Sequence, residues 1–148
     1  MINGRFIKLI IFVTLFLPVT TFCWPNASAS DDASLFGKKW MLVHVNGVEV
    51  QSNKPSITFD RDKKEVSVDG GCNHFSGSFT ISGMRLKFSR MLGTQMACAD
   101  SSRQEIENSF LKELRRVTRY EIRGDTLRLF RLKSQVLTFK ADTAATDE

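Results

Sequence analysis

Proline and glycine are scarce in this sequence, since its 148 residues include three prolines and nine glycines. This composition excludes collagen-like repeats and low-complexity chains rich in those two residues. The hydrophobic fraction of 42% and the charged fraction of 25% lie near the average for globular proteins, which excludes a wholly disordered chain and a coiled coil. Twelve phenylalanines can supply a hydrophobic core. Because domains usually contain about 100–150 residues, we expect one domain.

The excess of positive charge is also small. The formal net charge of +5 comes from 21 basic and 16 acidic residues, and Arg5 and Lys8 lie before the first acid, Asp31. Without those two, the chain has 19 basic residues and the same 16 acidic residues. The basic residues in 103–119 are mixed with glutamates, unlike the concentrated basic face of a nucleic-acid-binding protein. We therefore expect no nucleic-acid partner.

The apolar run near the N-terminus is short. Leu9–Leu17 does not reach the roughly 20 residues that a membrane-spanning helix needs. It follows two positively charged residues and precedes Ala27-Ser28-Ala29, a small-residue pattern typical of a cleavage point. This order predicts that residues 1–29 are a signal peptide for export, cut after Ala29. The alternative is an uncut segment that anchors the protein in a membrane.

Cys23 suggests a second route to the membrane. A lipid-modified cysteine follows the apolar run of exported bacterial lipoproteins, normally after small residues, but the residue before Cys23 is the bulky Phe22. We therefore expect a periplasmic or secreted protein, with an outer-membrane lipoprotein as the alternative. Only a lipid on Cys23 would then attach the protein to a membrane.

Short stretches that alternate apolar and polar residues predict β-strands along most of the chain. Small turns separate most of them, which favours antiparallel pairing. We expect an α+β protein with a curled antiparallel sheet or partial barrel of about seven or eight short strands, packed by one main helix. The stretches with strand-like patterns are Trp40–Val45, Val48–Val50, Ile57–Phe59, Glu65–Val68, Asn73–Ile81, Met84–Phe88, 120–122, Thr126–Leu132 and Val136–Lys140.

Local patterns predict the details of two strands. In Trp40–Val45, simple alternation places Trp40, Leu42 and His44 on one face. Asn46-Gly47 after it indicates a hairpin turn, because both residues can adopt positive φ. In the strand that contains Phe75, Phe79 and Ile81 on one face, Gly77 predicts a bulge or a sharp bend.

A helix is expected from about Ser102 to Thr118. Ser101 and Ser102 precede Gln104 and Glu105 in a capping-box pattern. The apolar stripe consists of Ile106, Phe110, Leu111, Leu114 and Val117. Around these elements we place a flexible lead-in at 30–36, a folded domain at 37–140 and a disordered tail at 141–148.

Several segments of the folded domain match a known pattern when taken together. They are Trp40 with Val45-Asn46-Gly47, then Pro55–Phe59, Gly71-Cys72-Asn73-His74-Phe75-Ser76-Gly77, Thr94-Gln95-Met96-Ala97-Cys98, and finally Glu107, Phe110, Leu114, Leu127 and Leu129. By these segments the chain resembles the META/HslJ domain family of bacterial envelope and secreted proteins, over about Leu35–Lys140. The structural motif residues are Trp40, Asn46, Gly47, Gly71, Asn73, Phe75, Gly77, Thr94 and Met96. The resemblance implies a compact sheet with one packed helix and no established catalytic site. It also implies roles in stress tolerance, including resistance to some antibiotics, or in secretion or motility.

Cys72 and Cys98 are the two cysteines that remain after a cut at Ala29. An even pair in an exported chain predicts a disulfide, and closing this loop would stabilise the fold by about 3 kcal/mol. The alternative is two buried thiols that pack as small hydrophobic groups. A metal site built from Cys72, His74, Cys98 and His44 is a further alternative. Zinc sites usually contain closely paired ligands such as C-x₂-C, which this chain lacks, so we expect no metal and no cofactor.

Signatures of catalysis are also missing from the sequence. Ser76 does not lie in G-x-S-x-G, and Gly70-Gly71 lacks the lysine of a phosphate-binding loop. Cys98 precedes the expected helix, but no C-x-x-C accompanies it. We expect structural roles for Asn73, whose amide would bond the backbone of the bend at 70–72, and for Thr94 and Gln95 in the long loop. We therefore do not expect an enzyme.

Three hypotheses for function follow. The first is a non-enzymatic, monomeric envelope protein that supports stress or antibiotic tolerance through surface binding to an envelope or secreted protein whose identity the sequence does not give. The second is a secreted inhibitor or partner-binding protein that targets another enzyme. The third is a carrier of a small molecule or metal.

Overall fold

The computed structural model describes residues 34–51 and 54–142, so Cys23 and the expected signal peptide lie outside the described part. The first strands are β1 (Lys39–Val45), β2 (Val48–Glu49), β3 (Ser56–Asp60), β4 (Glu65–Asp69), β5 (His74–Ser82), β6 (Arg85–Phe88) and β7 (Leu92–Gly93). The helix α2 (Ser101–Leu114) follows, and then β8 (Arg119–Arg123), β9 (Thr126–Arg131) and β10 (Ser134–Ala141). No helix in this part of the chain is long and apolar enough to cross a membrane.

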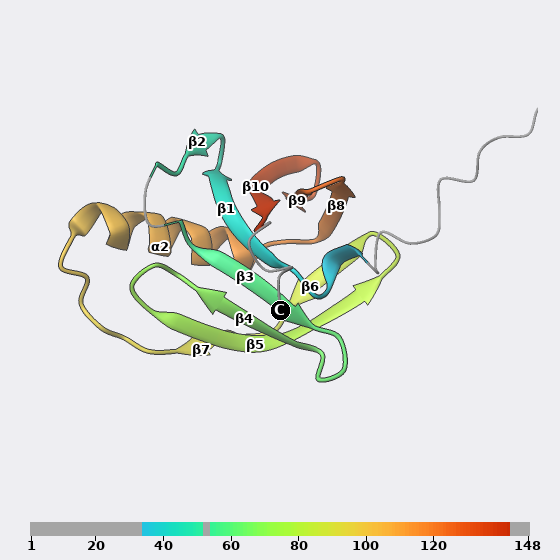
Figure 1. Ribbon diagram of the computed structural model, residues 1–148, viewed down its shortest axis with the longest axis horizontal. Coiled ribbons are helices and arrows are strands. Elements are labelled where there is room, and N and C mark those ends of the chain that lie inside the picture. Colours follow the sequence, from blue (N-terminus) through green and yellow to red (C-terminus); the bar gives the residue numbers. More distant parts are fainter. Residues whose placement is uncertain (1–33, 52–53, 143–148) are drawn as a thin grey trace, which may run out of the picture.

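The strands form a closed barrel (Figure 1). Neighbours pair antiparallel in the order β10–β9–β8–β6–β5–β4–β3–β1, and β1 also pairs with β10, so eight of the described strands close the ring. The short strands β2 and β7 pair with β1 and β5 outside this path. The predicted antiparallel curled sheet is confirmed, and the predicted partial barrel is roughly right except that the barrel is closed. Strands β1 and β10 pair from Trp40 with Ala141 to Val45 with Leu137, and this pairing closes the edge.

The barrel is least regular between β6 and β8. Arg85 and Arg119 are the one residue pair that links these strands in the ladder. Two further backbone bonds support the seam, from Leu86 N to the Thr118 carbonyl at 3.2 Å and from Tyr120 N to the Met84 carbonyl at 3.0 Å. Because α2 and its preceding loop connect the two sides, this seam joins segments that are distant in the sequence.

A β-bulge changes the faces of β1. The register with β10 shifts between Leu42 and His44. As a result Trp40, Leu42 and Val45 are buried while His44 is half-buried. The predicted face of Trp40, Leu42 and His44 is therefore wrong at His44, because an extra residue in one strand reverses the alternation after it.

Two predicted glycine features have different outcomes. Asn46 and Gly47 adopt φ of 49° and 82°, which confirms the hairpin turn. Gly77 pairs regularly with Val66, so the predicted bulge or bend is wrong. The glycine instead makes room for a neighbour, since a Cβ added there would lie 2.8 Å from the sulfur of Met91. Phe75, Phe79 and Ile81 share the predicted face and pack against the core.

Helix α2 is shorter than predicted and is capped by a different residue. The carboxylate of Asp100 accepts a bond from Ser102 N at 2.9 Å, so Asp100 is the N-cap, not Ser101 or Ser102. At the other end Val117 N donates to the Leu114 carbonyl and tightens the turn. Thr118 N then donates to Phe130 O, which draws the chain into the sheet. The helix therefore ends at Leu114, four residues before the predicted end at Thr118.

The core lies inside the barrel and continues under α2. The fully buried side chains from strands include Trp40, Leu42, Ile57, Leu86, Leu127, Leu129, Leu137 and Phe139. Phe110 of α2 meets the ring of Phe139 in β10, with the ring centroids 5.9 Å apart. The predicted apolar stripe of α2 thus covers the sheet, against β1 and β10.

The folded domain begins earlier than predicted. Leu35 is fully buried, and its carbonyl accepts a bond from the Trp40 indole nitrogen at 2.9 Å. A flexible lead-in up to Phe36 is therefore wrong for Leu35 and Phe36, while 30–33 lie outside the described residues. At the other end β10 includes Ala141, whose amide donates to Asp125 O at 2.9 Å. Asp142 N also donates to Lys39 O at 2.8 Å, so the predicted disordered tail is wrong for 141 and 142, while 143–148 lie outside the described residues.

Candidate functional site

Two of the segments that carry the family resemblance, Gly71–Gly77 and Thr94–Cys98, meet in space. A disulfide joins Cys72 to Cys98, with their Cα atoms 5.8 Å apart. It links the bend before β5 to the loop that runs from β7 to α2. The predicted disulfide is therefore confirmed, and neither sulfur is a free thiol that could bind a metal or act as a nucleophile.

Asn73 lies beside this disulfide and connects both segments. Its side chain is 3% exposed. Its Oδ1 accepts bonds from Met96 N at 2.7 Å and from the Thr94 hydroxyl at 2.9 Å, and its Nδ2 donates to Met96 O at 3.2 Å. The prediction that the Asn73 amide bonds the backbone of the bend at 70–72 is wrong. The bend at 70–72 is closed by the Asn73 carbonyl and by Asp69, while the Asn73 amide reaches across to the loop.

Glu107 of α2 completes the cluster from the opposite side. It is 2% exposed, and its Oε2 accepts bonds from Cys72 N at 3.1 Å and Asn73 N at 2.8 Å. Its Oε1 accepts a bond from Asn73 Nδ2 at 2.7 Å. The sequence did not predict that Glu107 accepts bonds from Cys72 and Asn73. The available signal was its position three residues before Phe110, on the same face of the helix.

Glycines allow the cluster to pack this closely. A Cβ at Gly70 would overlap the carboxyl group of Glu107, and a Cβ at Gly93 would overlap the His74 carbonyl. Gly71 has a φ of 100°, which favours glycine at the bend. The backbone of Met96 is held, whereas its side chain is 57% exposed.

The histidines do not join this cluster as metal ligands. His74 is exposed, and its Nδ1 lies 3.9 Å from Asp69 Oδ1. His44 lies on β1 opposite Glu49 and Thr138. Across 34–51 and 54–142, no three His, Cys, Asp or Glu side chains gather closely enough to hold a metal ion. Of the motif residues, Trp40 lies in the core, and Asn46 and Gly47 form their turn away from the cluster.

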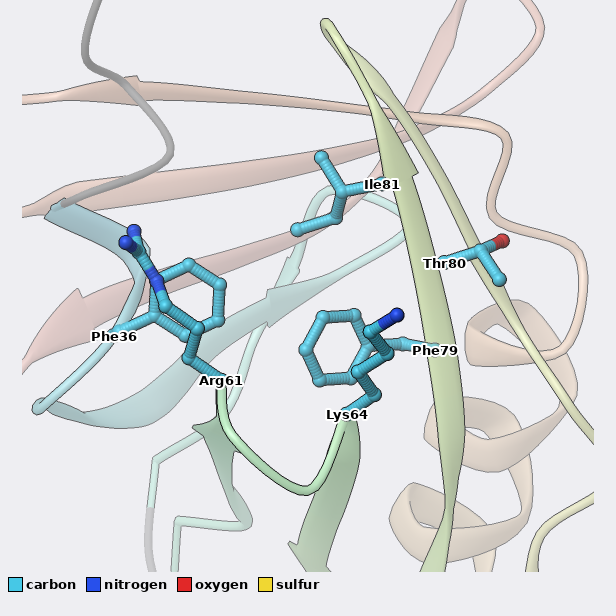
Figure 2. A pocket seen from close by; sticks show the side chains of 6 residues that line it. All are labelled: Phe36, Arg61, Lys64, Phe79, Thr80 and Ile81. Carbon is cyan, nitrogen blue, oxygen red and sulfur yellow. The ribbon is translucent and has the colours of Figure 1, made fainter.

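A separate hollow of about 400 Å³ opens on the surface near the turn between β3 and β4. It is lined by Phe36, Arg61, Lys64, Phe79, Thr80 and Ile81. Figure 2 shows the Phe36 ring behind the Arg61 side chain on one side, with Phe79, Lys64 and Ile81 on the other. Sequence reasoning missed this site because its residues come from three separate segments, and because the region 60–64 reads as an ordinary charged turn.

The turn beside the hollow is ordered by Asp60. Its Oδ1 accepts bonds from Asp62 N and Lys63 N, both at 3.0 Å, and its Oδ2 lies 3.2 Å from Lys63 Nζ. The hydrogen bond from the Lys63 backbone, followed by the bond from its side chain, holds the pKa of Asp60 below its usual range. Both oxygens of Asp60 thus interact with Lys63 or with the backbone of the turn.

Known proteins are similar to this chain in sequence and in fold. The META domain model matches residues 33–144. The heat shock protein HslJ of Escherichia coli K12 is 30% identical over 105 residues, which cover 69% of this chain and 72% of that protein. A structure solved by NMR has 30% identity and a TM-score of 0.60, covering 73% of this chain and 92% of that one. An NMR structure from Burkholderia xenovorans, at 24% identity and a TM-score of 0.61, covers 86% of this chain and 97% of its own, and shows the same fold.

The matched range contains both motif segments and the whole barrel, from Lys39 in β1 to Ala141 in β10. The match to HslJ likewise extends over more than two thirds of each protein. The chain belongs to the META domain family.

Proposed function

We propose that this protein is an exported, non-enzymatic envelope protein that supports tolerance of heat or antibiotic stress, and that it acts by binding through its surface. The name of the related heat shock protein HslJ supports the connection with stress. The observation that carries the proposal is the buried contact between Asn73 and Glu107.

That contact explains what the most specific family segments do. Asn73 and Glu107 are both buried, and each oxygen of the two side chains accepts at least one bond from inside the protein. These groups tie two loops to α2, and the residues that line the hollow near the turn between β3 and β4 and the hollows around Arg115 do not include Asn73 or Glu107. Because Asn73 and Glu107 are occupied by bonds inside the protein, they are not free to act on a substrate, which supports a role for the exposed surface in binding.

The outer side of α2 offers such a surface. Arg115 lines two adjoining hollows, one of about 290 Å³ with Lys112 and Arg116 and one of about 500 Å³ with Arg90. Among the ion pairs formed by the described residues, none involves these four cations. Unpaired positive side chains around hollows favour an acidic partner.

The disulfide supports the proposed location. Disulfides form and persist in oxidising compartments such as the bacterial periplasm, and they are rare in the cytosol. The bond between Cys72 and Cys98 therefore fits a chain that is exported by residues 1–29 and finishes folding in the periplasm or outside the cell.

A complementation experiment tests the proposal. A strain without the gene should survive heat shock and antibiotic exposure less well than its parent. The full chain should restore survival, and a chain without residues 1–29 should not. Lys112→Gln combined with Arg115→Gln should restore survival less well at an equal protein level, whereas Lys133→Gln combined with Lys140→Gln, matched in charge, should restore it fully.

Two results would contradict the proposal. Equal survival of the deletion strain and its parent under both stresses would remove the stress function. Full restoration by the chain without residues 1–29 would show that the protein works without export.

A further inference from the structure

The hollow between Phe36 and Phe79 has apolar walls formed by these two rings and by Ile81. The ring centroids of Phe36 and Phe79 lie 6.1 Å apart at an angle of 37°. Behind them, Phe59 packs edge-on against Phe79 with the centroids 5.3 Å apart, and Phe59 is 2% exposed. The position of Phe79 is therefore fixed from the core side, and its outer face contributes to the hollow together with Ile81.

Two cations lie at the rim of this hollow. The Arg61 guanidinium lies 4.3 Å from the centre of the Phe36 ring. Lys64 is placed by its backbone, which has a φ of 53° and accepts a bond from Phe79 N at 3.1 Å. In Figure 2 both side chains extend over the aromatic rings from the same turn.

These cations form no ion pair with Asp60 or Asp62, the acids of their own turn. Among the described residues neither Arg61 nor Lys64 forms an ion pair, while the neighbouring Lys63 is paired with Asp60. The Asp60 carboxylate also accepts two backbone hydrogen bonds, from Asp62 N and Lys63 N, so its interactions lie within the turn. The turn thus holds one cation in an internal pair and presents two others to the hollow.

We propose that this hollow binds a small amphipathic anion, a carboxylate carried on an apolar or aromatic body. Arg61 and Lys64 hold the carboxylate, and Phe36, Phe79 and Ile81 contact the body. The volume of about 400 Å³ lies within the range of about 300–1,000 Å³ that is typical of small-molecule sites. In Figure 2 the Thr80 side chain points away from those of Phe79 and Ile81, and the charged groups that line the hollow are those of Arg61 and Lys64.

This inference goes beyond the proposed function, because it names a ligand class at a site that neither the family segments nor the surface of α2 includes. The test measures binding of small-molecule probes to the purified full-length protein in the form that the cell produces. Failure of binding would leave the survival results unchanged, and failure of the survival experiment would leave the binding results unchanged.

The first arm of the test compares matched probes by NMR titration of backbone amides. We expect 2-naphthoate to shift the amides of Arg61, Lys64 and 79–81. We expect 2-naphthalenemethanol, which has the same rings without the charge, to bind about tenfold more weakly, and acetate to produce no saturable shift. Saturable binding of octanoate in place of 2-naphthoate would support the site and identify an alkyl body.

The second arm uses variants in the same turn. Arg61→Gln and Lys64→Gln should each weaken binding of 2-naphthoate by about fivefold to tenfold. Lys63→Gln, which makes the same change in net charge, should leave binding within about twofold, because Lys63 is paired with Asp60. Unchanged melting temperatures would establish that all three variants fold.

Several results would overturn the proposal. They are equal binding of the neutral alcohol, equal weakening by Lys63→Gln, saturable shifts only around Arg115, and no saturable shift with either 2-naphthoate or octanoate.

Discussion

The side-chain amide of Asn73 donates to the Glu107 carboxyl group across 2.7 Å, and this bond joins the entrance of β5 to helix α2 over 34 residues of sequence. The other oxygen of Glu107 accepts the backbone amides of Cys72 and Asn73. One helix side chain therefore accepts bonds from two backbone amides of the bend and from Asn73 Nδ2, which also donates to Met96 O. Such groups are costly when left unpaired, which explains why an acid lies on the buried face of this helix.

Removing Glu107 should destabilise the protein strongly. In Glu107→Ala, three donors lose their acceptor, and each unsatisfied buried group costs about 1–3 kcal/mol. We expect a loss of about 3 kcal/mol or more in the free energy of unfolding, measured by urea denaturation. Glu105→Ala, on the exposed side of the same helix, should change it by less than about 0.5 kcal/mol. Equal effects of the two substitutions would contradict the structural role of Glu107.

The disulfide should contribute as a single shared bond. We expect Cys72→Ser and Cys98→Ser to lower the free energy of unfolding by similar amounts, about 3 kcal/mol each, because either one opens the same loop. The double variant should be little worse than either single variant, which a thermodynamic cycle from thermal unfolding measures. Clearly additive losses would show that the two residues stabilise the protein independently.

The sequence predicted the features that depend on neighbouring residues. The Asn46-Gly47 turn follows from the ability of both residues to take positive φ, and the burial of Phe110 follows from the spacing of the helix stripe. The pairing of Cys72 with Cys98 followed from the number of cysteines and the expected compartment. The turn and the helix stripe depend on interactions between residues close in sequence, and the cysteine pair follows because only two cysteines remain after the expected cut.

Features that depend on partners far along the chain were not predicted. The bulge that turns His44 out of the buried face is set by the register of β1 against β10. The burial of Glu107 requires the bend at Cys72 and Asn73 to lie against α2. The hollow needs Phe36 to meet Phe79. A single sequence contains no local signal for such contacts, because each becomes favourable only after the barrel has closed.

The Phe110 ring should contribute strongly to the joint between α2 and the barrel. It is fully buried and meets the Phe139 ring, so Phe110→Ala would leave a cavity against β10. We expect a loss of about 3–5 kcal/mol, measured by denaturant unfolding. Lys112→Ala, an exposed substitution two residues along, serves as the control. A stability of Phe110→Ala close to that of the control would show that the helix does not pack on the sheet in this way.

The cap of α2 should make stability depend on pH in the acidic range. The hydrogen bond from the Ser102 hydroxyl, followed by the bond from its backbone N–H, lowers the pKa of Asp100 below its ordinary value of 3.8. A group with a depressed pKa in the folded state stabilises the protein above its unfolded pKa, and it loses this contribution as the pH falls through the folded pKa.

We therefore expect the difference in melting temperature between the natural protein and Asp100→Ala to be constant from neutral pH down to about pH 5, and to shrink as the pH falls below 3.8. The Asp125 carboxylate makes one exposed ion pair, so the same scan on Asp125→Ala controls for effects of low pH that do not involve the helix cap. A difference for Asp100→Ala that grows on acidification would have the opposite sign to this linkage, and it would exclude a cap that acts through the ionised carboxylate.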